Sequence, residues 1–100
     1  MVVVTSGHKY FVSNFEDTTS GQSIQFICKE AKGEELVTVF DGTTNEEVLS
    51  VLIDRMNYLQ SKFPCRENTI VITKLEESLM WLNKRTADRV NRNVEGKYII

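Results

Sequence analysis

Residues 44–64 read TNEEVLSVLIDRMNYLQSKFP and contain the strongest structural signal in this chain. Thr44 followed by Glu47 is a capping-box pattern, which marks the start of a helix. After it, apolar residues recur at spacings of three and four: Val48, Leu49, Leu52, Ile53, Met56, Leu59 and Phe63. This period predicts an amphipathic helix from Asn45 to Ser61, with an apolar stripe wide enough for both a helix partner and a sheet. Pro64 ends this helix or starts the next one.

A second helix is predicted from Pro64 or Cys65 to Asn91, because no Gly or Pro interrupts this stretch. Its inward stripe is expected to contain Val71, Leu75, Leu79 and Leu82, while Ile72, Met80 and Trp81 lie off that stripe. Roughly 27 helical residues extend about 40 Å, which exceeds the diameter of a compact domain of this length. The helical hairpin, expected over residues 43–92, should therefore project and expose apolar surface. A second copy of the chain is the expected partner, so we predict a homo-oligomer.

The residues before the hairpin, 1–42, are predicted to form an antiparallel β-meander. Its three strands are expected at Tyr10–Phe15, Ile24–Lys29 and Leu36–Phe40, with Gly33 at positive φ in the turn between the last two. The expected fold class is α+β, a small N-terminal antiparallel sheet packed with a long C-terminal antiparallel helical hairpin. Residues 93–100 are expected to form a tail that leaves the helix through Asn93 in a left-handed conformation.

Composition predicts a single soluble domain: 100 residues, 41% of them hydrophobic and 26% charged. The longest apolar run, residues 79–82, is far too short to span a membrane. The start of the chain lacks the features of a secretory signal, and two cysteines do not make a disulfide scaffold, so the cytosol is the expected compartment. A net charge of −2 argues against a general duplex-DNA binder.

The chain lacks the residues that several kinds of catalysis require. One histidine, His8, and two separated cysteines, Cys28 and Cys65, indicate neither a metal site nor a nucleophile–base pair. The dispersed glycines form no phosphate-binding loop, and Glu67, Glu76 and Glu77 are most simply solvated helix charges. We therefore expect no metal and no cofactor, and a hydrolase is a poor fit. An alternative role for Cys65 is that of a reactive thiol, because a helix start can lower the pKa of a cysteine.

A stripe on the second helix points instead to ligand binding. Residues 1–47 carry a net charge of −5 and residues 48–100 carry +3, so the basic character lies in the second half. Within it, Trp81, Arg85, Arg89 and Arg92 recur at spacings of four, four and three along one helical face. An indole can stack on a base, and guanidinium groups can bind phosphate oxygens in pairs. The alternative is an exposed basic face with Trp81 in a protein interface.

Several motifs resemble the phage Thoeris anti-defence sponge proteins and the related helical hairpin of the anti-CBASS sponges. They are Arg66-Glu67-Asn68, Ile72-Thr73-Lys74-Leu75-Glu76-Glu77, Trp81-Leu82, Arg85-Thr86, Asp88-Arg89 and Val94-Glu95-Gly96. The stretch Asp41-Gly42-Thr43-Thr44-Asn45-Glu46-Glu47-Val48-Leu49, together with the β-rich beginning, is more similar to the Thoeris branch. Residues 91–93 depart from the Arg-Gly ending associated with that family.

The resemblance implies a non-enzymatic phage protein that captures a cyclic ADP-ribose isomer in the cytoplasm of the infected bacterial host. It also implies cyclic di- or trinucleotides as ligands of some members at separate sites. The ligand contacts that it implies are Tyr58, in place of a phenylalanine, with Asn68, Arg85, Thr86 and Arg89; Arg66, Trp81 and Arg92 are further candidates. The simpler roles are a helix cap for Asn68 and a half-buried packing residue for Tyr58.

Asn68 and Arg85 are seventeen positions apart on one predicted helix, about 26 Å at the standard rise. One chain therefore cannot bring both to one small ligand, and we expect two antiparallel protomers to share each site, in a dimer or a trimer of dimers. Two other functions remain open. The first is an interaction or assembly module that uses Met80 and Trp81, and the second is single-stranded nucleic-acid binding, which usually needs more positive charge.

Overall fold

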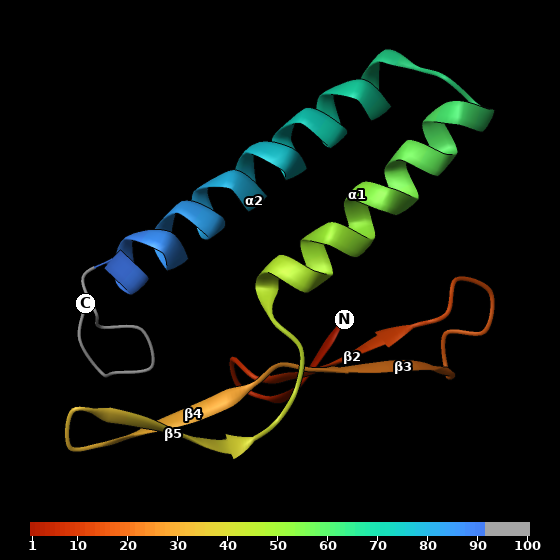
Figure 1. Ribbon diagram of the computed structural model, residues 1–100. Coiled ribbons are helices and arrows are strands. Elements are labelled where there is room, and N and C mark those ends of the chain that lie inside the picture. The colour runs from red at the N-terminus through yellow and green to blue at the C-terminus, as the bar shows by residue number, and fades with distance from the viewer. Residues whose placement is uncertain (92–100) are drawn as a thin grey trace. The chain divides into compact units, whose positions relative to one another are not determined.

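A computed structural model describes residues 1–91 and shows an α+β chain, which confirms the predicted class. Five strands come first: β1 (Val2–Thr5), β2 (Lys9–Ser13), β3 (Gly21–Gln25), β4 (Cys28–Lys32) and β5 (Glu35–Phe40). Two helices follow, α1 (Asn45–Lys62) and α2 (Arg66–Asn91) (Figure 1). The chain divides between these parts into two compact units, residues 1–44 and the helical residues from Asn45 onward.

The first unit contains two small antiparallel sheets, so the expected single three-stranded meander is wrong. One sheet has the order β1-β2-β3, and the other pairs β4 with β5. β1 was not expected, although Val2, Val3 and Val4 are β-branched residues that favour strands. The T-shaped contact between Tyr10 and Phe26, with ring centroids 5.9 Å apart, lies within this unit.

The expected strand Ile24–Lys29 is divided because a distant segment binds its middle. The Thr43 N–H donates to the Gln25 carbonyl oxygen at 2.8 Å, and the Ile27 N–H donates to the Thr43 carbonyl oxygen at 2.9 Å. Gly42 lets the two segments approach, since a Cβ there would collide with the backbone of Gln25. These bonds form a parallel bridge between residues 26 and 43, and the chain changes from β3 to β4 around it.

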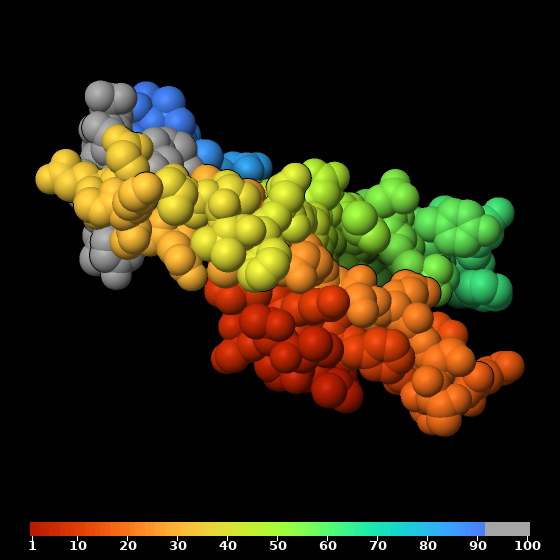
Figure 2. Space-filling view, turned by 90° about the horizontal axis from the view of Figure 1, so that it is seen from below, coloured from red at the N-terminus to blue at the C-terminus, as the bar shows by residue number. Residues whose placement is uncertain are grey.

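The turns are set by local chemistry. Gly33 has φ of 69° in the β4–β5 turn, as predicted. The loop between β2 and β3 forms one end of the first unit (Figure 2), and the Asp17 carboxylate organises it. This carboxylate accepts hydrogen bonds from the Thr19 N–H at 3.1 Å, the Thr19 hydroxyl at 2.5 Å and the Ser20 hydroxyl at 2.9 Å. Those donors lower the pKa of Asp17, with the Thr19 hydroxyl as the largest cause.

The second unit is the antiparallel hairpin of α1 and α2, whose bounds lie within two residues of the predicted ones. On α2 the half-buried residues facing α1 are Asn68, Ile72, Leu75, Leu79 and Leu82; Arg89 is also half-buried, in the last turns of the longer helix. Ile72 therefore belongs to the stripe, and the prediction that Val71 does so is wrong, because Val71 is 41% exposed. Leu52 on α1 and Phe63, the residue after it ends, are also exposed, so the apolar stripe of the first helix is narrower than predicted. The expected tail and Asn93 lie outside the described residues.

Candidate functional site

The hairpin bend carries three of the predicted ligand residues: Tyr58, Arg66 and Asn68, here called the bend group. The last residues of α1 close with the Phe63 N–H donating to the Leu59 carbonyl oxygen at 2.8 Å. Cys65 then caps α2, since its sulfur accepts a hydrogen bond from the Asn68 N–H at 3.4 Å. The cap is therefore Cys65, and Asn68 lies inside the helix.

Tyr58 lies on the side of α1 that faces away from α2. It follows the stripe residue Ile53 by five positions, a rotation of about 140° on an α-helix. Its side chain is 59% exposed, so the interpretation as a half-buried packing residue is wrong. The Lys62 ammonium lies 5.6 Å from the centre of its ring, within the range of a cation–π contact. An exposed phenol ring of this kind can stack on a base.

Asn68 is half-buried at the start of α2. Its carboxamide nitrogen donates to the Phe63 carbonyl oxygen at 3.5 Å. Among the described residues this is the hydrogen bond that the carboxamide makes, so its oxygen and second N–H can bind a ligand. Arg66, the first residue of α2, is exposed.

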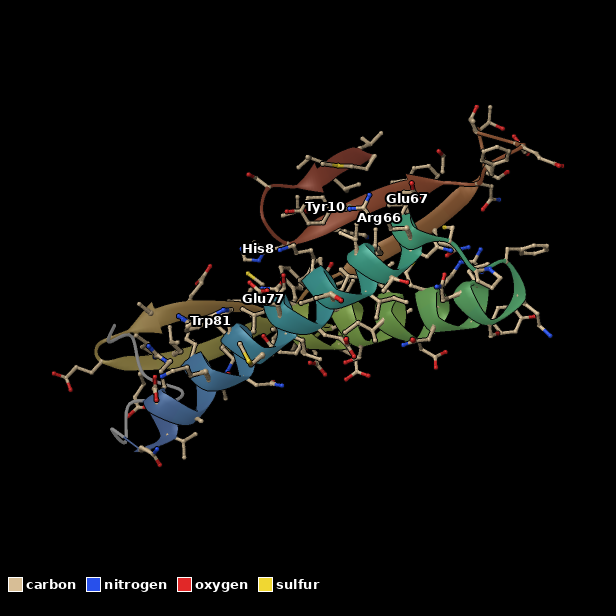
Figure 3. All side chains as sticks on the ribbon, turned by 90° about the horizontal axis from the view of Figure 1, so that it is seen from above. His8, Tyr10, Arg66, Glu67, Glu77 and Trp81 are labelled. Carbon is tan, nitrogen blue, oxygen red and sulfur yellow. The ribbon has the colours of Figure 1, made fainter. Side chains whose placement is uncertain are left out.

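The remaining described candidates, Trp81, Arg85, Thr86 and Arg89, lie in the C-terminal half of α2 and are here called the far group. Trp81 is 58% exposed, Arg85 and Thr86 are exposed, and Arg89 is half-buried. Figure 3 shows Arg66 at the start of α2 and Trp81 well along the helix. Arg92 lies outside the described residues.

One chain does not bring the bend group and the far group together. Both α2 segments belong to one uninterrupted helix from Arg66 to Asn91, so Asn68 and Arg85 are separated by about 26 Å along its axis. A ligand that contacts both groups requires a second chain. Within one chain, each group offers only part of the predicted site.

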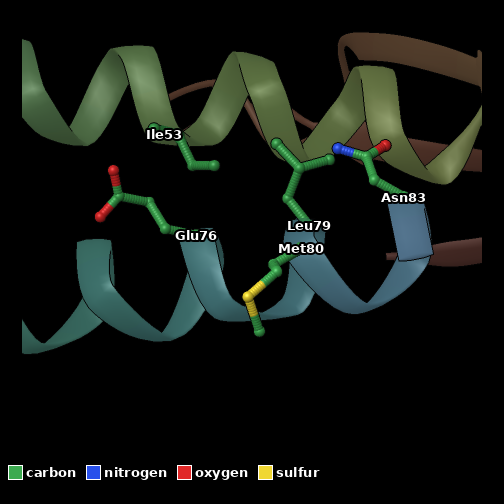
Figure 4. Close-up of a pocket in the computed structure, with 5 residues that line it drawn as sticks. All are labelled: Ile53, Glu76, Leu79, Met80 and Asn83. Carbon is green, nitrogen blue, oxygen red and sulfur yellow. The ribbon is translucent and has the colours of Figure 1, made fainter.

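Sequence reasoning missed an open groove between the two helices. Ile53, Leu79 and Met80 supply its apolar lining, and its volume is about 460 Å³. Glu76 and Asn83 lie at its two ends, with Leu79 between them (Figure 4). The spacing of four and three between Glu76, Met80 and Asn83 is the signal that could have indicated one common helix face. The Glu76 carboxylate disfavours an anionic ligand there, and the groove contains no member of either group.

Two further results concern residues 1–91 alone. No group of three or more His, Cys, Asp or Glu in this part of the chain could hold a metal ion. Neither described helix combines the length and the apolar character needed to cross a membrane.

The hairpin and its exposed aromatic and basic groups define a class of helical-hairpin domain, and comparison with known families agrees. The family described as "Acb2/Tad1, hairpin domain" matches residues 24–87. A curated relative, "Thoeris anti-defense 1" of Bacillus phage SBSphiJ7, is 56% identical over 108 aligned residues, covering 97% of this chain and 76% of the relative. The chain belongs to the Tad1-like family, which confirms the resemblance drawn from its motifs.

Proposed function

We propose that this chain is a phage anti-defence protein that binds a cyclic ADP-ribose-type immune signal of the Thoeris system and sequesters it without cleaving it. The supporting observation is its similarity, over nearly its whole length, to a phage protein named for Thoeris anti-defence. The family match also includes most of the proposed ligand residues, namely Tyr58, Arg66, Asn68, Trp81, Arg85 and Thr86.

In the proposed site, the bend group of one chain meets the far group of an antiparallel partner. Tyr58 stacks on the base, and Asn68 bonds to its polar edge. Arg85 and Arg89 neutralise the pyrophosphate through paired hydrogen bonds, with Thr86 beside them. A two-fold axis makes two equivalent sites in each dimer, and a trimer of dimers repeats the same unit.

The required affinity favours a preformed site. Nanomolar capture corresponds to about −12 kcal/mol, whereas a ligand of roughly 35 heavy atoms yields about −10 kcal/mol at ordinary ligand efficiency. The difference must come from groups that are already ordered before the ligand arrives. Side chains placed on two packed helices meet this condition better than side chains on long loops.

Calorimetry with the cyclic ADP-ribose isomer purified from a TIR-domain enzyme's reaction with NAD tests the proposal. Arg85→Ala and Arg89→Ala should each weaken binding by about 1.5 to 3 kcal/mol, because each removes charge-assisted hydrogen bonds. Lys84→Ala is the matched control: it removes a neighbouring positive charge, but Lys84 forms an exposed ion pair with Asp88 at 3.2 Å. Undiminished affinity in both arginine variants would remove them from the site.

Sequestration also predicts the fate of the ligand. Denaturing the complex should release the ligand intact, and mass spectrometry identifies it. Steady turnover with released product would overturn the non-enzymatic role. Cyclic di- and trinucleotides are the second ligand class for the same titration, since the family resemblance implies them.

One observation favours a second candidate function, a protein-interaction or assembly module. Met80 and Trp81 are 54% and 58% exposed on α2, and large exposed apolar side chains are typical of protein interfaces. A pure assembly module should show no rise in melting temperature with any nucleotide. A nucleotide-dependent rise at micromolar ligand supports the proposed sequestration instead.

A further inference from the structure

A closed cycle of three hydrogen bonds joins α1 and α2 at the hairpin bend. The Gln60 carboxamide nitrogen donates to the Thr69 hydroxyl oxygen at 2.9 Å, and that hydroxyl donates to the Cys65 carbonyl oxygen at 3.4 Å. The Cys65 N–H donates back to the Gln60 carboxamide oxygen at 3.0 Å. Both polar atoms of the Gln60 carboxamide, its nitrogen and its oxygen, are therefore hydrogen-bonded. We call this arrangement the bend cycle.

The bend cycle fixes the backbone on both sides of Asn68. Asn68 lies between two members of the cycle, Cys65 and Thr69, whereas Tyr58 is turned about 200° from Gln60 on α1. The hydrogen bond of the Asn68 side chain to the bend is long, at 3.5 Å. The shorter bonds of Gln60 thus hold the segment from which Asn68 projects.

The cycle contributes less to hairpin stability than to the geometry of the bend. Gln60 is half-buried, while Cys65 and Thr69 are exposed, so water competes for their hydrogen bonds. The packing of the two helices rests on the apolar stripe that includes Ile72 and Leu79, farther along α2. Loss of the cycle should free the orientation of the bend and leave the helices paired.

We infer that Gln60 and Thr69 are positioning residues for the ligand site, an inference that rests on the proposed function. They act through Asn68 and need no contact with the ligand. By holding the start of α2 against the end of α1, they order Asn68 before the ligand arrives, so binding does not cost the entropy of ordering it. The bend cycle is thus a source of the preorganisation that tight capture demands.

Two near-isosteric substitutions test this inference by calorimetry with the cyclic ADP-ribose isomer. Gln60→Leu removes both bonds of the carboxamide, and Thr69→Val removes the hydroxyl. Each should weaken binding about fivefold, as expected for a lost hydrogen bond of about 1 kcal/mol. Thr69→Ser keeps a hydroxyl and should retain the wild-type affinity. Thr73→Val is the control, because the Thr73 hydroxyl bonds at 3.0 Å to a carbonyl of its own helix.

A double-mutant cycle separates positioning from general destabilisation. In an Asn68→Ala background, Gln60→Leu should lower the binding affinity almost no further, because the side chain that Gln60 positions is gone. In an Arg85→Ala background it should keep its full fivefold cost. Equal costs in both backgrounds would overturn the inference, as would unchanged affinity of Gln60→Leu and Thr69→Val beside a wild type that binds. A wild type that binds no ligand would instead remove the proposed function itself.

Discussion

Two binding-deficient variants of this chain should restore each other's ligand site if antiparallel protomers share it. Asn68→Ala removes a contact of the bend group, and Arg85→Ala removes a contact of the far group. In a heterodimer of the two variants, one pocket combines both substitutions, and the other pocket combines the two intact residues. The perturbation therefore creates a wild-type pocket from two defective chains.

The magnitude follows from the length of α2. Because Asn68 and Arg85 are about 26 Å apart along that helix, a single chain offers no pocket that contains both. Random pairing of equal amounts makes half of the dimers heterodimers, and each has one intact pocket of two. About a quarter of all pockets should then bind with wild-type affinity.

The assay is calorimetry on the two variants coexpressed with different affinity tags, so that the chains pair as they fold. Titration of the mixture should show about 0.25 tight sites per chain, against about one for the wild type and none for either variant alone. A mixture that binds no better than the separate variants would refute the shared site. It would place Arg85 and Asn68 in different sites.

Three other predictions concern the fold. Ile72→Ala should lower the free energy of unfolding by about 1 to 2 kcal/mol in urea titrations, because Ile72 faces α1. Val71→Ala should lower it by less, because Val71 is exposed, and equal losses would contradict the observed stripe. Gly33→Ala should destabilise the β4–β5 turn by about 1 kcal/mol because φ is 69°; unchanged amide exchange across that hairpin would argue against it. Asp17 should titrate below its ordinary pKa of 3.8, so its stabilising effect is present above that pH and is lost as the pH falls through the lower folded value. Carboxyl NMR measures the midpoint, Asp17→Asn should abolish the effect, and a midpoint at or above 3.8 would be incompatible with the hydrogen bonds from Thr19.

The helices could be predicted because their signals are local. The capping pattern of Thr44 and Glu47, the position of Pro64 and the three-four spacing all involve residues within a few positions of one another. The stripe of α2 shows the limit of such signals, because it contains Ile72 where Val71 was predicted. Both are β-branched, and they precede Leu75 by three and four positions, so either suits the same stripe. The position of α1 decides between them.

The sheets were harder to predict because their decisive bonds are distant in sequence. No Gly or Pro interrupts the stretch from Ile24 to Lys29, and no local pattern shows that Thr43 binds the backbone within it. The candidate site also combines features that the sequence shows with features that it does not. Its residues were available from motifs on the two helices, whereas the bond from Gln60 to Thr69 crosses the bend and was not.

No residue among 1–91 is buried in the single chain. An isolated copy therefore leaves more apolar surface in water than a chain with a closed core, and it gains less of the free energy that offsets the entropy lost on folding. Association with the proposed second copy would stabilise the fold by mass action, so we expect the melting temperature of this protein to climb with its concentration.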